Sequence, residues 1–369
     1  MVQVQGTCAD AFGAVRYAFE DNLASGEELG ASICVDLDGE RVVDLWGGFR
    51  DEGRTTAWTE DTITNVWSTT KTVTSLAAMM QFAAAGKEDI EVRHLISHTS
   101  GVSGWDPPFT VEDMYDWETA TSRLAAQAPW WQPGTASGYH ANNQGHLVGE
   151  VLRRITGSPL KQFVAEEIAA PLQADFQIGA REQDWSRTAP VVPPPPLAFD
   201  LAALPPDSPV VRTFTGPVAD AAKANTPGWR RADQGALNGH GNARSVARVL
   251  SVVARGGEVD GVRLLSPETI ELIFQEQSHG MDLVLGVPIR FGIGWALPEP
   301  ELVPYVPDGK ICFWGGWGGS LIITDLERGL TIAYMMNKMG PGIIGSARSE
   351  AYVRAVYTAL DVQTPPAGA

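Results

Sequence analysis

The alternation of apolar and polar residues predicts β-strands near both ends of the chain. Every second residue from 31 to 37 is apolar, and Asp38-Gly39 can turn the chain into a returning strand over 41–46. Further strands are predicted near the C-terminus, over residues 289–297, 309–316, 319–325 and 330–337. Because short turns join these last strands, the predicted sheet is antiparallel.

Apolar residues at helical spacing predict α-helices near the start of the chain and through its middle. Three such segments, 8–26, 147–155 and 245–254, each end at or shortly before a glycine that can close the helix. Ser346 can cap a last helix, and the proline-rich stretch 190–209 is predicted to be an extended surface loop. Strands at both ends with helices between them predict an α+β fold, in which the chain leaves a sheet and later re-enters it.

The composition is that of a folded, acidic protein. Hydrophobic residues make up 44% of the 369 residues, which is enough for a sizeable core and excludes a disordered chain. The formal net charge of −17 repels phosphate backbones and anionic lipid surfaces. Neither a nucleic acid nor a membrane is therefore expected as a partner.

Three cysteines, Cys8, Cys34 and Cys312, are too few for a disulfide framework and fit a reducing compartment. The first residues lack the basic and apolar stretches of a signal peptide, and no apolar run is long enough to span a bilayer. A cytoplasmic location is expected from these features.

The strongest sign of chemistry is the segment Ser68-Thr69-Thr70-Lys71, an S-x-x-K motif. A serine hydroxyl needs a neighbouring base to act as a nucleophile, and residues three apart on a helix share one face, so Lys71 would lie beside Ser68. The β-branched residues around the motif disfavour a helix, yet an apolar helical pattern continues behind it, and such local conflicts are expected at functional sites. The alternative is a serine that caps a helix, with a lysine on the surface.

A second S-x-x-K lies at Ser158-Pro159-Leu160-Lys161. Its serine is followed by proline, a residue favoured at the first helical position. This copy is therefore predicted to be an ordinary helix start with Ser158 as the N-cap.

Two other segments can contribute to a site around Ser68. Tyr139 can act as a general base if a cation lies beside it, although a tyrosine is more often a core residue whose hydroxyl is satisfied. Glycines in the segment 313–320 mark the close approach of a ligand or of another stretch of backbone, and a free N–H there can hold an oxyanion; a bulged strand is the alternative.

Tryptophans are abundant in and near these motifs. They can line an apolar pocket, although most tryptophans pack in cores. The tryptophans concerned are Trp67, Trp105, Trp314 and Trp317.

Other chemistries find little support in the sequence. His94 and His98 have the spacing of a metal-binding helix, but they lack the H-E-x-x-H glutamate and a third ligand, so no metal site is predicted. Neither a G-x-S-x-G nucleophile elbow nor a P-loop occurs.

Taken in order, the motifs resemble those of the serine β-lactamase and penicillin-binding-protein-like superfamily, and within it the class C β-lactamase-like esterases known as family VIII carboxylesterases. Ser68-Thr69-Thr70-Lys71 matches the first motif, Tyr139-His140-Ala141 resembles the Y-x-N or Y-x-x box, and Trp314-Gly315-Gly316 stands where β-lactamases have K-T-G. The resemblance covers nearly the whole chain and also includes residues 93–101, 133–135 and 241–245.

The resemblance implies an antiparallel sheet flanked by helices, plus a mostly helical domain, with the active site between the two. The sheet domain would comprise residues 1–67 and 240–369, and the helical domain residues 68–239. This division agrees with the order of strands and helices predicted above.

The resemblance also implies a serine hydrolase that needs no metal or cofactor. Ser68 would attack an ester carbonyl, and Tyr139, with Lys71 beside it, would take the serine proton and pass it to the leaving alcohol. The N–H groups of Ser68 and Trp317 would form the oxyanion hole, and water would then hydrolyse the acyl-enzyme. The residues expected to contact the substrate are Trp105, His140, Trp314, Gly315 and Gly316.

Two departures from β-lactamases favour a small, neutral, short-chain ester as the substrate. Trp314 cannot bind a substrate carboxylate as the lysine of K-T-G does, and Ala141 lacks the amide of Y-x-N. At most weak β-lactam hydrolysis is expected. The alternatives left open are a β-lactamase or amide hydrolase, an acyltransferase that uses an alcohol in place of water, and a non-catalytic binding protein on the same fold.

The chain also departs from its relatives behind the nucleophile helix, where they carry a longer segment. Here Met80 leads directly into Gln81 and the alanines 83–85, which are good helix formers and poor turn formers. We therefore expect that Met80 and Gln81 are not bonded neighbours in the natural protein and that a loop between them is missing.

Overall fold

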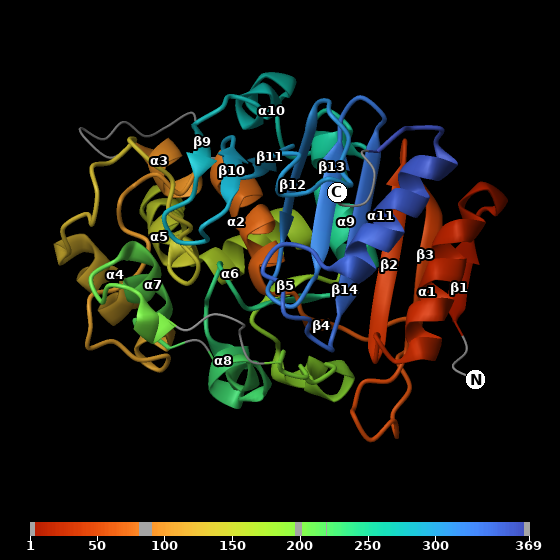
Figure 1. Cartoon of the computed structure of the whole chain (residues 1–369), viewed down its shortest axis with the longest axis horizontal. Coiled ribbons are helices and arrows are strands. Elements are labelled where there is room, and N and C mark those ends of the chain that lie inside the picture. Colours follow the sequence, from red (N-terminus) through yellow and green to blue (C-terminus); the bar gives the residue numbers. More distant parts are fainter. Residues whose placement is uncertain (1–3, 81–90, 196–200, 219, 365–369) are drawn as a thin grey trace.

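The structure, a computed structural model, describes residues 4–80, 91–195, 201–218 and 220–364. A nine-stranded antiparallel sheet forms its centre (Figure 1), in the order β1-β3-β2-β14-β13-β12-β11-β10-β9. Strands from the two ends of the chain meet where β2 pairs with β14, as the strand pattern predicted. The strands are β1 (Gln5–Cys8), β2 (Gly30–Leu37), β3 (Glu40–Gly48), β9 (Ser278–Met281), β10 (Pro288–Phe291), β11 (Ala296–Leu297), β12 (Ile311–Gly315), β13 (Leu321–Asp325) and β14 (Leu330–Met336).

The turns of this sheet explain where the strand predictions succeeded and failed. Asp38 and Gly39, between β2 and β3, have φ angles of 51° and 88°, the left-handed conformations that a tight hairpin requires. The predicted strand 289–297 is instead two antiparallel strands, β10 and β11, because the chain turns back between them with Gly294 at a φ of 86°. The edge strand β1 was not predicted, since its residues are polar and mostly exposed.

Helices cover both faces of the sheet (Figure 1). α1 (Gly13–Ser25) and α11 (Ala347–Ala359) pack against each other over one face, and α9 (Ala243–Ala254) packs on the other. The alternation along β2 separates the two cores, because Ile33 belongs to the first and Cys34 to the second. The hydroxyl of the predicted N-cap of α11, Ser346, accepts the Ser349 N–H.

The other helices gather in a mostly helical region beside the sheet (Figure 1). The described residues also form two short sheets. One contains β4 (Thr64–Asn65), β6 (Gly239–Gly241) and β5 (Gln177–Ile178), and the other contains β7 (Glu258–Val259) and β8 (Val262–Arg263). The helices are α2 (Thr70–Met79), α3 (Val92–Ile96), α4 (Trp117–Ala126), α5 (Gln144–Thr156), α6 (Leu160–Phe163), the π-helix η5 (Val164–Ala169), α7 (Pro209–Thr215), α8 (Pro227–Arg231) and α10 (Pro267–Ile273). The 3-10 turns are η1 (Asp10–Phe12), η2 (Trp67–Thr69), η4 (Asp113–Tyr115), η6 (Glu182–Arg187), η7 (Leu201–Ala203) and η8 (Ala221–Asn225).

The α2 helix forms against local propensity because it is buried on every side. The hydroxyls of its threonines find acceptors inside the protein: Thr72 Oγ1 donates to Thr69 O at 2.7 Å, and Thr74 Oγ1 donates to Gly235 O at 2.7 Å. The cost of placing β-branched residues in this helix is therefore offset by packing against neighbours such as α5.

Two sequence predictions involve residues outside the described part of the chain. The predicted break at the Met80–Gln81 junction involves residues 81–90, which lie outside it. The proline-rich stretch is described except for residues 196–200; residues 190–195 have no regular helix, and α7 begins at its last proline, Pro209.

Candidate active site

Ser68 lies in η2, the 3-10 turn that leads directly into α2. Its neighbour Trp67 has a φ of 51°, a left-handed conformation that is unfavourable for a residue other than glycine and that is found mostly at functional sites. One turn later, Lys71 Nζ lies 3.0 Å from Ser68 Oγ. The helical spacing therefore brings the serine and the lysine together as predicted.

The Lys71 amine is held entirely inside the protein. Besides Ser68 it contacts two backbone carbonyls, Ala141 O at 2.7 Å and Ala236 O at 2.9 Å. No carboxylate in the described part of the chain forms an ion pair with it, and its burial lowers the pKa of Lys71 well below its ordinary value.

Tyr139 reaches the same point from the segment before α5. Its ring lies 4.9 Å from Lys71 Nζ, and its hydroxyl accepts the indole N–H of Trp314 at 3.0 Å. Burial raises the pKa of Tyr139, while hydrogen bonding to the Ser68 hydroxyl and to Trp314 opposes that rise. The predicted convergence of Tyr139 and Lys71 on Ser68 is thus seen in the contacts of all three side chains.

The backbone of Tyr139 is fixed by a buried carboxylate. Its N–H donates to Asp282 Oδ1 at 3.0 Å, and the N–H groups of Val284 and Leu285 donate to the same oxygen. Burial raises the pKa of Asp282, and these three hydrogen bonds oppose the rise. No sequence motif pointed to Asp282, because it lies in a turn far along the chain.

The glycines around Trp314 allow two stretches of backbone to approach closely. A Cβ atom on Gly316 would lie only 2.6 Å from Val66 O and 3.0 Å from Trp67 Cβ. The end of β12 and the following turn therefore pack directly on the segment that carries Ser68. Within the described residues, the N–H of Trp317 in this turn has no hydrogen-bond acceptor.

Three tryptophans form an apolar wall next to Ser68. The Trp67 ring makes edge contacts with Trp229 and Trp317, with ring centroids 5.5 Å and 5.2 Å apart. All three line a small cavity of about 40 Å³, in which Asp220 is the charged residue. Trp229 was not predicted, since nothing in its local sequence distinguishes it from a core tryptophan.

Two predicted substrate contacts are corrected by the structure. His140 is fully buried, and its ring nitrogens are engaged by Ser100 Oγ at 2.6 Å and Gly138 O at 2.7 Å. Trp105 is also fully buried; it stacks on Phe109 and donates its indole N–H to Ala120 O. Both side chains are packed in the core, where their ring nitrogens are already hydrogen-bonded within the protein.

His98 is a member of the site that the sequence suggested only as a weak metal ligand. Its ring lies 4.9 Å from that of Tyr139, and its Nδ1 accepts the N–H of His140 at 3.2 Å. Burial lowers the pKa of His98 well below its ordinary value, so the ring is neutral. The described residues contain no cluster of three His, Cys, Asp or Glu side chains that could hold a metal ion.

The second S-x-x-K has a different environment. The helix α6 begins at Leu160 with Pro159 as its N-cap, so Ser158 lies one residue too early to be the cap that was predicted. Lys161 Nζ donates to Arg231 O at 3.2 Å, and within the described residues no hydrogen bond joins it to Ser158.

A serine, a buried lysine and a tyrosine thus meet where β12 of the sheet touches the start of α2. A serine hydroxyl with a buried amine beside it is the arrangement of a candidate serine hydrolase site. Among the described residues, no helix is both long and apolar enough to cross a bilayer.

Comparison with known proteins agrees with this class. The family model of beta-lactamases matches residues 15–356. A crystal structure of a family VIII carboxylesterase is 36% identical, with a TM-score of 0.88 over 97% of this chain and 100% of that chain. A penicillin-binding protein homologue from Caulobacter crescentus is 35% identical, with the same TM-score and coverage.

The esterase/beta-lactamase LipL of Mycobacterium tuberculosis is 29% identical to this chain, across 91% of it and 83% of LipL. The chain therefore belongs to the beta-lactamase family. Its fold, a large antiparallel sheet with flanking helices, is the β-lactamase/transpeptidase-like fold that the sequence predicted.

Proposed function

We propose that this protein is a serine carboxylesterase that cleaves esters through an acyl-enzyme on Ser68. The observation that carries the proposal is the 3.0 Å contact between Ser68 Oγ and the buried amine of Lys71. Similarity to a family VIII carboxylesterase and to the esterase/beta-lactamase LipL supports the choice of an ester as substrate.

In this mechanism Lys71, rather than Tyr139 as the sequence suggested, takes the proton from Ser68. Burial lowers the pKa of Lys71 and raises that of Tyr139, so both side chains are favoured in their neutral forms. A neutral amine is a competent base, whereas a neutral phenol is not. A neutral Lys71 can donate one N–H to each of its two carbonyl partners and point its lone pair at the Ser68 hydroxyl.

The same three contacts also suit the ammonium that forms after proton transfer. Its three N–H groups would each find an acceptor at Ser68 Oγ, Ala141 O or Ala236 O. Lys71 can therefore gain and lose a proton without moving, which is the requirement for shuttling a proton between steps.

Tyr139 is proposed to carry that proton onward to the leaving alcohol. An indole N–H can only donate, so the bond from Trp314 occupies a lone pair of the Tyr139 oxygen and leaves the phenolic O–H free to donate. That O–H would first donate a hydrogen bond to Ser68 Oγ and then give its proton to the leaving oxygen, and the Lys71 ammonium would return a proton to the Tyr139 oxygen, so both side chains end neutral.

The developing negative charge is proposed to be held by the N–H groups of Ser68 and Trp317. The Trp317 N–H has no acceptor among the described residues, so it is available for a substrate oxygen. The turn that carries it packs on the Ser68 segment through Gly316, so the two donors belong to one rigid unit.

The substrate is proposed to be a neutral ester with a short, apolar acyl group. Trp314, with Gly315 and Gly316 behind it, occupies the place of a carboxylate-binding lysine and is itself engaged by Tyr139. The cavity lined by Trp67, the neighbour of Ser68, is small and largely apolar, and its charged lining residue, Asp220, would repel a carboxylate. Anionic β-lactams are therefore expected to be poor substrates.

The site is proposed to lie between two domains, a sheet domain of residues 1–67 and 240–369 and a helical domain of residues 68–239. Ser68 and Lys71 would belong to the helical domain, and Trp314 and Trp317 to the sheet domain. A cytoplasmic location stays a prediction from the sequence.

The experiment that tests the nucleophile is labelling with a fluorophosphonate, followed by peptide mapping. The adduct is expected on the peptide that contains Ser68, to be absent from Ser68→Ala and to be unchanged in the matched control Ser158→Ala. An adduct on any other serine, or full ester hydrolysis by a folded Ser68→Ala variant, would overturn the proposal.

The substrate class is tested by comparing a short-chain aryl ester with a cephalosporin. We expect kcat/KM to be higher for the ester by about two orders of magnitude or more, because the site lacks both polar contacts that a β-lactam needs. Comparable rates on the two substrates would instead favour a β-lactamase.

A further inference from the structure

A second cavity lies away from the catalytic residues, between α6, the π-helix η5 and β5. Its volume is about 750 Å³, which is in the range of small-molecule sites. Its wall is largely apolar and includes Ala165, Ala169, Phe176 and Ile178. A π-helical turn such as η5 is rare and is frequently found at functional sites.

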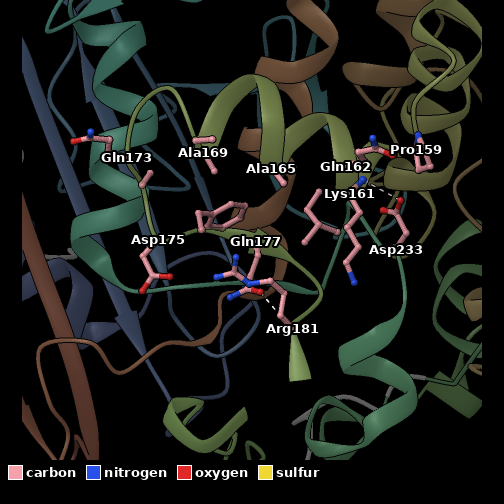
Figure 2. Close-up of a pocket in the computed structure, with 14 residues that line it drawn as sticks. Pro159, Lys161, Gln162, Ala165, Ala169, Gln173, Asp175, Gln177, Arg181 and Asp233 are labelled. Atoms are coloured by element: carbon pink, nitrogen blue, oxygen red, sulfur yellow. Dashed lines mark hydrogen bonds between the residues drawn. The ribbon is translucent and has the colours of Figure 1, made fainter. Parts of the chain in front are cut away.

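Two charged residues, Lys161 and Asp233, lie on the same side of this cavity (Figure 2). Lys161 and Asp233 both line it, but in the described part of the chain neither forms an ion pair with the other or with a third residue. The remaining charges are already neutralised, because Arg181 pairs with Asp184 and Asp175 pairs with Arg187.

Each of the two charges retains unused hydrogen-bonding capacity. Within the described residues, the ammonium of Lys161 makes a single hydrogen bond, to Arg231 O at 3.2 Å. The carboxylate of Asp233 accepts the Lys161 backbone N–H through Oδ2 at 3.0 Å, and its buried Oδ1 has no partner among the described residues. A buried carboxylate oxygen without a partner is costly, so a ligand group that satisfies it gains affinity.

We propose that this cavity binds a zwitterionic α-amino acid with an apolar side chain. Its carboxylate would pair with Lys161, its ammonium with Asp233, and its side chain would lie on the apolar wall near Ala165 and Ala169. Figure 2 shows this arrangement, with the two charged residues on the same side and the alanines of η5 alongside.

A ligand with only one charge would fit less well. A simple carboxylate would pair with Lys161 but would face the charge of Asp233, and a simple amine would meet the opposite mismatch with Lys161. Burial raises the pKa of Asp233 to about 6, which leaves it mostly ionised at neutral pH. Both charges are therefore present where a zwitterion complements them.

The test is isothermal titration of the full chain with three matched ligands: L-leucine, L-leucinamide, which lacks the carboxylate, and N-acetyl-L-leucine, which lacks the ammonium. Leucine is expected to bind with a Kd of about 1 mM or tighter, and each analogue at least about fivefold more weakly. No saturable binding of leucine, or equal binding of all three ligands, would overturn the proposal.

Two variants assign the contacts. Lys161→Met should remove the preference for leucine over leucinamide, and Asp233→Asn, which keeps the acceptor for the Lys161 N–H, should remove the preference for leucine over N-acetyl-leucine. Lys310→Met, a surface lysine paired with Glu271, is the matched control and should leave all three affinities unchanged.

Ester hydrolysis and the melting temperature of each variant show whether it has folded. If a variant does not fold, the comparison of the three ligands on the unaltered protein still tests whether the cavity prefers a zwitterion. Leucine binding that is unaffected in folded Lys161→Met and Asp233→Asn would place the ligand elsewhere and contradict the assignment.

Discussion

The segments Ser68-Thr69-Thr70-Lys71 and Ser158-Pro159-Leu160-Lys161 share one motif, and both lie at the start of a helical segment. In the first, the side chains of Ser68 and Lys71 are 4% and 1% exposed and are hydrogen-bonded to each other. In the second, Ser158 and Lys161 are half-buried and do not touch within the described residues. The motif sets the spacing, but burial lowers the pKa of Lys71 well below its ordinary value, as the proposed role of a base requires.

Substitution of each lysine in turn is the most direct test of whether the two lysines differ in function. Lys71→Ala should lower kcat/KM on an aryl ester by about 10³-fold, because the nucleophile loses its base. Lys161→Ala, the matched control, should change it by less than about twofold. Steady-state kinetics measure both, with circular dichroism to confirm folding; similar losses in the two variants would show that burial does not distinguish them.

Removal of the Tyr139 hydroxyl should have the next largest effect. Tyr139→Phe is expected to lower kcat by about 10²-fold, since the leaving alcohol loses its proton donor. Tyr305→Phe removes a hydroxyl from another buried tyrosine and should leave kcat nearly unchanged. If Tyr139→Phe retained full activity, Lys71 would have to deliver the proton alone.

A smaller loss of activity is expected when the indole N–H that hydrogen-bonds to the Tyr139 hydroxyl is removed. Trp314→Phe should lower kcat by about tenfold with little change in KM, because it removes one buried hydrogen bond that orients the phenol. In a double variant with Tyr139→Phe the two losses should not add, since both act through the same hydroxyl. Additive losses would give Trp314 a role of its own, such as contact with the substrate.

The pH dependence sharpens the comparison without any substitution. In the proposed mechanism the neutral form of Lys71 is the active one, so kcat/KM should fall as the pH is lowered through the pKa of Lys71 and rise to a plateau above it. Because burial lowers that pKa, the fall in kcat/KM should occur at a pH well below the ordinary pKa of a lysine. A fall at the pKa of an exposed lysine would contradict a desolvated base.

Much of the fold could be predicted because its signals are local. The β2–β3 hairpin follows from alternation and an Asp-Gly turn, and α5 and α9 follow from apolar spacing and the glycines behind them. The strand predicted over 289–297 was wrong because a turn inside an apolar run leaves the alternation nearly intact. Edge strand β1 was missed because an exposed edge carries no apolar pattern.

The candidate site, like the fold, could be predicted only where its residues carry local sequence motifs. Ser68, Lys71 and Tyr139 carry recognisable motifs, and the structure brings them together. His140 and Trp105 were expected at the substrate because they adjoin those motifs, but adjacency in sequence does not fix which way a side chain points. Asp282 and Trp229 were missed since each reaches the site only through the fold.

From spacing along the chain, the sequence alone predicts that Ser68 and Lys71 share one helix face, and it predicts the β2–β3 hairpin and the helices α5 and α9. It could not determine the protonation of Lys71, since that depends on burial beneath α5 and the sheet and on two carbonyls from distant segments, Ala141 and Ala236. The packing in three dimensions distinguishes the lysines of the two S-x-x-K segments, because a pKa reports the surroundings of a group in space and not its neighbours in sequence.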